Sequence, residues 1–156
     1  MPGNDSQRAY VILSLPFFFQ ETSESCVAAC LRMVLAYWGI KEEEAALREC
    51  CQTTRLGTTF PNAAQCVRGF GLQVDEVSGV TWNDLQSWLS NDVYPILSVN
   101  LFPLEARWAA HAVAVEQADE QEVVYLDPLF GRRVSDRIPF EQAWQMRRSK
   151  ALLIRP

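Results

Sequence analysis

Cys26 is the residue of this sequence best placed to act as a nucleophile. It follows a polar stretch, Glu21 to Ser25, that can cap a helix, and it opens an apolar run that can form the helix and that Gly39 can end. A cysteine in the first turn lies among unpaired backbone N–H groups and at the positive end of the helix dipole, which favour a thiolate over a thiol. The sequence therefore predicts a reactive thiolate at this position.

His111 and Asp127 have the residue types that such a nucleophile requires. His111, the only histidine, opens the strand-like segment HAVAVEQ, and Asp127 ends the segment EVVYLDP, with the polar turn ADEQ between them. Pairing of the two segments as a hairpin brings both residues to the same end of a sheet. A cysteine nucleophile needs a nearby base, and the imidazole needs a partner that fixes its tautomer. The spacing thus predicts a triad of Cys26, His111 and Asp127.

Gln20 can supply the remaining requirement of acyl transfer, which is a donor to the developing oxyanion. Its side-chain amide and the backbone N–H of Cys26 are the two candidate donors. Singly, each of the four residues also has an ordinary structural interpretation: a buried thiol, a loop glutamine, a strand histidine and a turn aspartate. The combination of all four in one chain favours the catalytic interpretation.

The expected elements divide the chain into a helical first half and a strand-rich second half, which is typical of an α+β domain. The helices are expected at residues 26–38, 41–52, 61–69, 81–89 and 140–148, and the strands at 72–77, 94–101, 111–117, 122–128, 132–135 and 151–154, after an early strand or extended lead-in at 9–19. Arg32 is the only charge between Val27 and Trp38, so the first helix should be buried. In the connection before His111, Phe102 and Trp108 are candidate walls of a cleft.

Composition limits the possible classes of protein. The chain has 156 residues, of which 49% are hydrophobic and 21% charged, as expected for one globular domain over residues 1–156 with a frayed end at 1–8. Fourteen basic and nineteen acidic residues give a net charge of -5, which argues against a nucleic-acid partner. The run from Ala9 to Phe19 is too short to span a bilayer and lacks the features of a signal peptide, so no membrane span is expected. No cofactor is required by these patterns.

The five cysteines are an odd number, so at least one thiol is unpaired in a monomer. Their spacings do not resemble a secreted disulfide framework, which favours a reducing compartment and a cytoplasmic location. A zinc site built from Cys30, Cys50, Cys51 and Cys66 is an alternative, although no C-x-x-C pair is present.

From about Gln20 to Ile154 the sequence resembles the peptidase C39 family, the bacteriocin-processing cysteine peptidases, which are a branch of the papain-like fold. The matching features, in chain order, are Gln20, Cys26, the helix end AYWG, Gly57-Thr58, Pro95-Ile96, His111, Asp127-Pro128 and the segment Phe140 to Trp144. The resemblance implies a central, buried N-terminal helix packed on an antiparallel sheet. It also implies that Cys26 is acylated, that His111 is the general acid and base, that Asp127 orients it, and that Gln20 helps to form the oxyanion hole.

For function, the resemblance implies a bacterial cysteine peptidase that cleaves a peptide bond, with a leader or precursor peptide as substrate. Many members are fused to an exporter and cleave after a Gly-Gly pair. This sequence shows no transporter segments, so we expect a stand-alone enzyme associated with an exporter or a peptide-biosynthesis system. The family's Asp-Cys-Gly is Ser25-Cys26-Val27 here, and the valine is expected to reshape the cleft. Two alternatives remain open: a leader-peptide-binding module with weak catalysis, and an acyltransferase or transglutaminase-like enzyme with the same triad.

Overall fold

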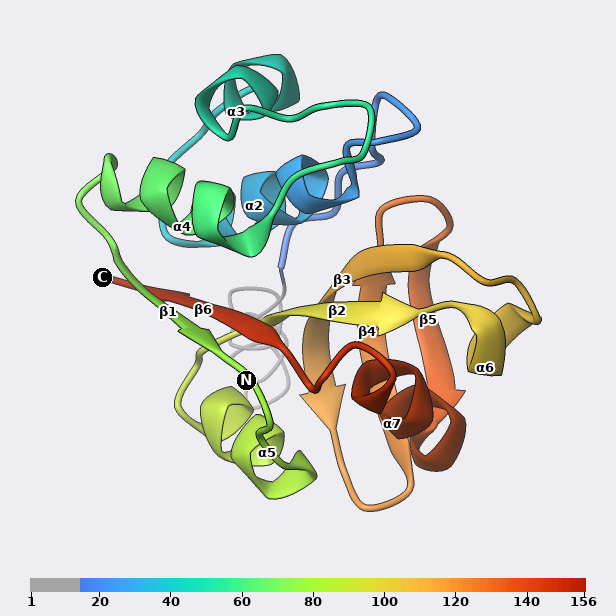
Figure 1. The fold of residues 1–156 in the computed structure, drawn as a ribbon. Helices are drawn as coiled ribbons and strands as arrows, with labels where there is room; N and C mark the ends of the chain where they lie inside the picture. The colour runs from blue at the N-terminus through green and yellow to red at the C-terminus, as the bar shows by residue number, and fades with distance from the viewer. Residues whose placement is uncertain (1–14) are drawn as a thin grey trace, which may run out of the picture.

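The computed structural model describes residues 15–156, which form six helices and one antiparallel sheet of six strands. Helices α2 (Cys26–Tyr37), α3 (Glu44–Cys50) and α4 (Phe60–Arg68) lie together on one face of the sheet, at the top of Figure 1. Helices α5 (Trp82–Ser90) and α7 (Arg137–Gln145) cover the other face, at the bottom of the figure. The predicted α+β class is confirmed.

The sheet contains strands that are distant in the sequence. Its order is β1 (Gln73–Val77), β6 (Ala151–Arg155), β2 (Ile96–Asn100), β3 (Ala110–Ala118), β4 (Glu122–Asp127) and β5 (Gly131–Asp136), and every neighbouring pair is antiparallel. Successive side chains alternate between the two faces, so that Leu152 and Ile154 pack towards α2 whereas Ala151 and Leu153 pack towards α5 and α7. Each of the two faces thus has its own core.

Helix α2 is buried over most of its length, as predicted. Its residues from Val27 to Leu35 are buried apart from Arg32, and the chain leaves the helix through Gly39, whose φ of 87° is strained for any residue with a Cβ. The predicted side-chain cap is wrong, because Ser25 makes no such bond to the helix. Its hydroxyl instead accepts from the Thr22 N–H and donates to the Thr22 carbonyl, both at 3.0 Å. The serine therefore closes the preceding turn and leaves the first N–H groups of α2 without a side-chain acceptor.

Several predicted boundaries need correction. Helix α3 is shorter than the predicted 41–52, and a short helix, α6 (Phe102–Glu105), lies within the predicted connection at 102–110. Helix α7 begins and ends three residues before the predicted 140–148, because Pro139 is tolerated in a first turn and because Arg148 and Ser149 have positive φ where the chain turns into β6. Of the predicted lead-in at 9–19, only residues 15–19 are described, and they form neither helix nor strand. No helix within 15–156 is long and apolar enough to cross a membrane.

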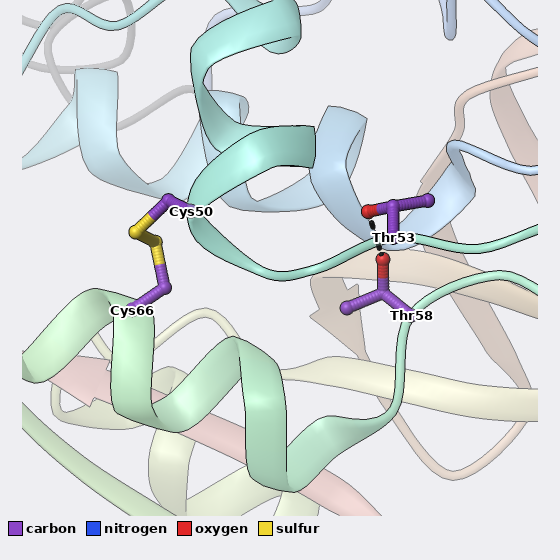
Figure 2. Close-up of a disulfide and its surroundings, with 4 residues drawn as sticks. All are labelled: Cys50, Thr53, Thr58 and Cys66. Atoms are coloured by element: carbon purple, nitrogen blue, oxygen red, sulfur yellow. Dashed lines mark hydrogen bonds between the residues drawn. A yellow bond between two sulfur atoms is a disulfide. The ribbon is translucent and has the colours of Figure 1, made fainter.

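The cysteines give the largest departure from the sequence-based expectations, because two of them form a disulfide although reduced thiols were expected. Cys50 at the end of α3 and Cys66 on α4 form a disulfide with their Cα atoms 5.5 Å apart (Figure 2). The reason is the packing of α3 beside α4, which the spacing of 16 residues alone does not reveal. The same packing excludes the four-cysteine zinc site, and within residues 15–156 no cluster of three or more His, Cys, Asp or Glu side chains could hold a metal ion. Beyond the disulfide, the hydroxyls of Thr53 and Thr58 are hydrogen-bonded at 2.6 Å across the loop that joins the two helices.

Candidate active site

Cys26 is the first residue of α2, and it is the only free cysteine that is not fully buried. The helix packs on β3, and Cys26 lies close enough to His111, near the start of that strand, to help raise the pKa of the imidazole. The other free thiols are poor competitors as nucleophiles. Burial raises the pKa of the Cys30 thiol well above its ordinary value and raises that of Cys51 to about 11.

His111 and Asp127 form a buried pair at one end of the β3–β4 hairpin. The two strands pair from Ala118 opposite Val123 to Ala114 opposite Leu126, with one bulge, so His111 and Asp127 reach the same end of the sheet. The Nε2 atom of His111 lies 2.8 Å from Oδ1 of Asp127, and the two residues are only 6% and 1% exposed. This bond occupies Nε2 and leaves Nδ1 as the ring nitrogen that can exchange a proton with another group.

The electrostatics favour a charged imidazole. Burial lowers the pKa of His111, but the hydrogen bond to Asp127 and the contact with Cys26 outweigh burial and raise the pKa from 6.5 to about 9. Burial raises the pKa of Asp127, but the bonds from His111 and from the Leu129 N–H, at 2.8 Å each, outweigh it and hold that pKa below its ordinary value. The carboxylate is therefore ionised and holds the imidazole through Nε2.

Gln20 is attached to the turn that follows Asp127. Its backbone N–H donates to the carbonyl of Pro128 at 2.9 Å, although the two residues are far apart in the chain. Its side-chain Nε2 donates to the carbonyl of Thr22 at 2.7 Å, and its buried Oε1 has no hydrogen-bond partner within residues 15–156. An amide nitrogen carries two hydrogens, so the bond to Thr22 leaves one for another acceptor.

Arg133 is a residue of the site that sequence reasoning missed. Its Nη1 atom lies 3.9 Å from Oδ2 of Asp127 and 3.5 Å from Oε2 of Glu105, and its guanidinium lies over the ring of Phe130 at 4.4 Å. Its positive charge helps to keep the pKa of Asp127 low. The period of two along β4 and β5 could have identified it, because Arg133 pairs with Tyr125, which lies on the same face of β4 as Asp127.

Exposed apolar side chains come from the segments that carry the site. They lie beside Gln20, in the connection before His111, and after Asp127-Pro128: Phe19, Phe102, Trp108, Leu129 and Phe130. Phe102 and Trp108 are stacked with their ring centroids 4.5 Å apart, and Trp108 is 69% exposed. Large apolar side chains that stay in contact with water are typical of a surface that binds a ligand.

The chemistry available at this place is acyl transfer through a cysteine. A helix-terminal thiol lies near an imidazole that is held by a buried carboxylate, and the N–H groups at the start of the helix have no side-chain acceptor. The loop carrying Gln20 is attached to the turn beside the carboxylate.

Comparison with known proteins places the chain in a family. A model of the peptidase C39 family matches residues 14–156. Among solved structures, a Bacillus anthracis protein described as a C39-like peptidase aligns with a TM-score of 0.77 and 18% identity, over 92% of this chain and 96% of its own. A double glycine motif protease from an AMS/PCAT transporter, solved with its leader peptide, aligns with a TM-score of 0.76 and 20% identity, over 92% and 93% of the two chains.

The peptidase domain of Streptococcus ComA, a bi-functional ABC transporter, aligns with a TM-score of 0.73 and 18% identity, over 92% of this chain and 99% of that domain. No curated protein sequence matches the chain. The structural likenesses, at such low identities, support the fold, whereas the family model matches nearly the whole chain. The chain therefore belongs to the peptidase C39 family.

Proposed function

We propose that this protein is a papain-like cysteine peptidase that cleaves a peptide bond in a leader or precursor peptide. The observation that carries the proposal is the buried pair of His111 and Asp127, 2.8 Å apart, near the only free thiol that is not fully buried. Family membership and the likeness to peptidase domains of transporters support the same class of enzyme.

In the acylation step, Sγ of Cys26 attacks the carbonyl carbon of the scissile peptide bond and a C–S bond forms. The carbonyl oxygen becomes an oxyanion, to which the backbone N–H of Cys26 and the side-chain amide of Gln20 donate. The His111 imidazolium gives its Nδ1 proton to the leaving nitrogen, the C–N bond breaks, and the amine product departs. Asp127 stays ionised and holds the ring through Nε2 during this transfer.

In the second step, His111 is neutral and takes a proton from a water molecule, whose oxygen attacks the thioester carbon. The C–S bond breaks, the acid product leaves, and the proton returns to the thiolate–imidazolium pair. An amine in place of water would give a new amide by the same route, which is the transferase alternative. No metal ion takes part in these steps.

We assign the substrate class from the apolar surface beside the site. The stacked rings of Phe102 and Trp108 and the exposed Phe130 can bind apolar side chains of an extended or helical peptide. A relative that cleaves at a double glycine motif was solved with its leader peptide, which supports a leader peptide as substrate. Val27 follows the nucleophile, so we expect the residues on either side of the cleaved bond to differ from a strict Gly-Gly pair.

The cellular context is also part of the proposal. We place the enzyme beside an exporter or a peptide-biosynthesis system in a bacterium, because two of the structural relatives are peptidase domains of transporters. The cytoplasmic location stays a prediction. The disulfide between Cys50 and Cys66 argues against it, since reducing compartments keep such thiols reduced.

The test combines peptide cleavage with selective alkylation. A library of precursor-type peptides is incubated with the wild type, with Cys26→Ala and with Cys30→Ala, a matched control on the same helix, and the products are identified by mass spectrometry. We expect cleavage by the wild type and the control, and none by Cys26→Ala. Brief treatment with limiting iodoacetamide should label Cys26 first, and more slowly in His111→Ala.

The outcomes separate the three hypotheses. A peptide that binds and is never cut would contradict the peptidase proposal in favour of a binding module. Amide products formed with added amines, at the expense of the acid, would support the transferase. Labelling that does not prefer Cys26 would remove the basis of both enzymes.

A further inference from the structure

We propose that Glu44 is a positioning residue for the oxyanion side of the site, because it fixes the backbone next to Gln20. The inference rests on the proposed function in that Gln20 is taken as a donor to the oxyanion. Glu44 belongs to α3 and does not touch the reacting atoms. It acts through the segment between residues 20 and 25 that leads into Cys26.

The side chain of Glu44 points inward although it belongs to a run of three glutamates, Glu42 to Glu44. It is 0% exposed, whereas the side chain of its neighbour Glu43 is 79% exposed. Burial of a carboxylate is costly unless it is hydrogen-bonded and paired. Its Oε1 accepts the backbone N–H of Glu21 at 2.9 Å. Its Oε2 has no hydrogen-bond partner within residues 15–156 and forms only an ion pair, at 3.2 Å, with Nε of Arg48.

The bond to Glu21 matters because Glu21 directly follows Gln20. The N–H of Gln20 donates to the carbonyl of Pro128, in the turn beside Asp127, and the next N–H donates to Glu44. Two successive backbone groups are therefore attached to different parts of the molecule, one to the end of β4 and one to α3. The origin of the Gln20 side chain is held from both directions.

The helix that carries Glu44 is itself held firmly. Leu47 and Cys51 are buried, and the disulfide from Cys50 joins the end of α3 to α4 (Figure 2). Because the helix is fixed, the Glu44 carboxylate restricts the position of the Glu21 backbone N–H that it binds. Donors to an oxyanion need such precision, since a misplacement of about 1 Å can cost about a hundredfold in rate.

Two arginines complete the contact between the segment and the helices. Arg48 also lies 3.7 Å from Oε1 of Glu21, and Arg32 of α2 lies 3.8 Å from Oε2 of Glu21 and 3.0 Å from Oε2 of Glu43. These pairs are partly exposed and are expected to contribute little singly. The bond that directly restrains the backbone is the partly buried one from the Glu21 N–H to Glu44.

The variants separate positioning from general support of the fold. Glu44→Ala removes the acceptor, Glu44→Gln keeps a side-chain oxygen for the Glu21 N–H, and Glu43→Ala is the matched control one residue away. Alkylation of Cys26 by iodoacetamide forms no oxyanion, so its rate reports the pair of Cys26 and His111 alone. Addition of the Cys26 thiol to the aldehyde acetyl-Gly-glycinal gives a hemithioacetal whose oxygen lies in the oxyanion hole, so its affinity reports the donors.

The experiment measures the affinity of the aldehyde as protection of Cys26 against iodoacetamide, which needs no turnover. We expect both Glu44→Ala and Gln20→Ala to weaken binding of the aldehyde at least tenfold, with the alkylation rate of Glu44→Ala within about twofold of wild type. Glu44→Gln should recover most of the affinity, and Glu43→Ala should match wild type. With a cleaved peptide, the loss should fall on kcat and leave KM within about twofold.

Two results would overturn the inference. Wild-type affinity in Glu44→Ala would show that the bond does not position the donor, and an equal loss of alkylation and aldehyde affinity in both Glu44 variants would show general damage to the fold. An aldehyde that binds wild type and Gln20→Ala equally would refute the donor role of Gln20 and the role of Glu44 with it. Fast alkylation of Cys26 in that case would leave the proposed nucleophile intact, so the two failures can be told apart.

Discussion

Raising the pH from about 6 to about 9 should lower the free energy of unfolding of the wild type by about 3 kcal/mol more than that of a His111→Gln variant. The reason is the buried pair of His111 and Asp127, which binds a proton more tightly in the folded state. The bond to Asp127 and the contact with Cys26 raise the pKa of His111 from 6.5 to about 9 despite burial. At about 1.4 kcal/mol per pKa unit, the preference of the folded state for the imidazolium amounts to about 3 kcal/mol.

Stability falls with rising pH because the folded state binds the His111 proton more tightly than the unfolded state. Below pH 6.5 the histidine is charged in both states and the full contribution is present. Between 6.5 and about 9 the unfolded chain releases the proton while the folded chain keeps it, so stability falls as the pH rises. Above about 9 the folded state also loses the proton and the contribution is gone.

The assay is urea unfolding of both proteins at several pH values from 6 to 9, without reductant. The buried thiols of Cys30 and Cys51 have raised pKa values and also lower stability near the upper limit, but both proteins share them and the difference cancels their effect. Parallel stability curves for the two proteins would refute the reasoning. They would mean that His111 gains no proton affinity on folding, and that Asp127 does not hold it as described.

Two further predictions concern the disulfide and the exposed aromatic side chains. Replacing Cys50 by serine should lower the free energy of unfolding, measured in urea without reductant, by about 3 kcal/mol, because the bridge closes a loop of about 15 residues in the unfolded chain. An unchanged free energy of unfolding would contradict the bridge to Cys66. Five reactive thiols in the denatured wild type, where three are expected, would contradict it too. Trp108→Ala should raise KM about three- to tenfold for peptides with bulky apolar residues, because this exposed ring is assigned to substrate binding, and should leave the rate of Cys26 alkylation unchanged. Equal KM values for the wild type and Trp108→Ala would show that the ring does not bind the substrate.

Much of the fold was predictable because its signals are local. The capping box at the start of α5 is one example: the Thr81 hydroxyl accepts from the Asp84 N–H at 3.2 Å, and the Asp84 carboxylate accepts from the Thr81 N–H at 2.8 Å. The strands from β1 to β6 were expected at nearly their observed positions, since most of them are short segments rich in Val, Ile and Leu. The boundaries of α3 and α7 were less accurate, because turns into the next element end these helices.

The pairing of His111 with Asp127 was also within reach of the sequence. A short polar turn between two strand-like segments determines their register to within a residue or two, and that register brings the ends of the strands together. Arg133 was missed although the same alternation along β5 indicates its face. Charged residues on strands are usually solvated, so the sequence alone does not indicate that Arg133 lies beside the carboxylate.

The sequence by itself determined the helix that begins at Cys26, the hairpin that carries the buried pair, and the type of chemistry they allow. Each depends on residues a few positions apart, where chain geometry leaves few choices. Only the tertiary structure decided that Cys50 bonds to Cys66, that Gln20 is attached to Pro128, and that Glu44 is buried against Glu21. These contacts join segments that α2, α3 and the sheet bring together, and their formation depends on the packing of whole elements, which no local pattern records.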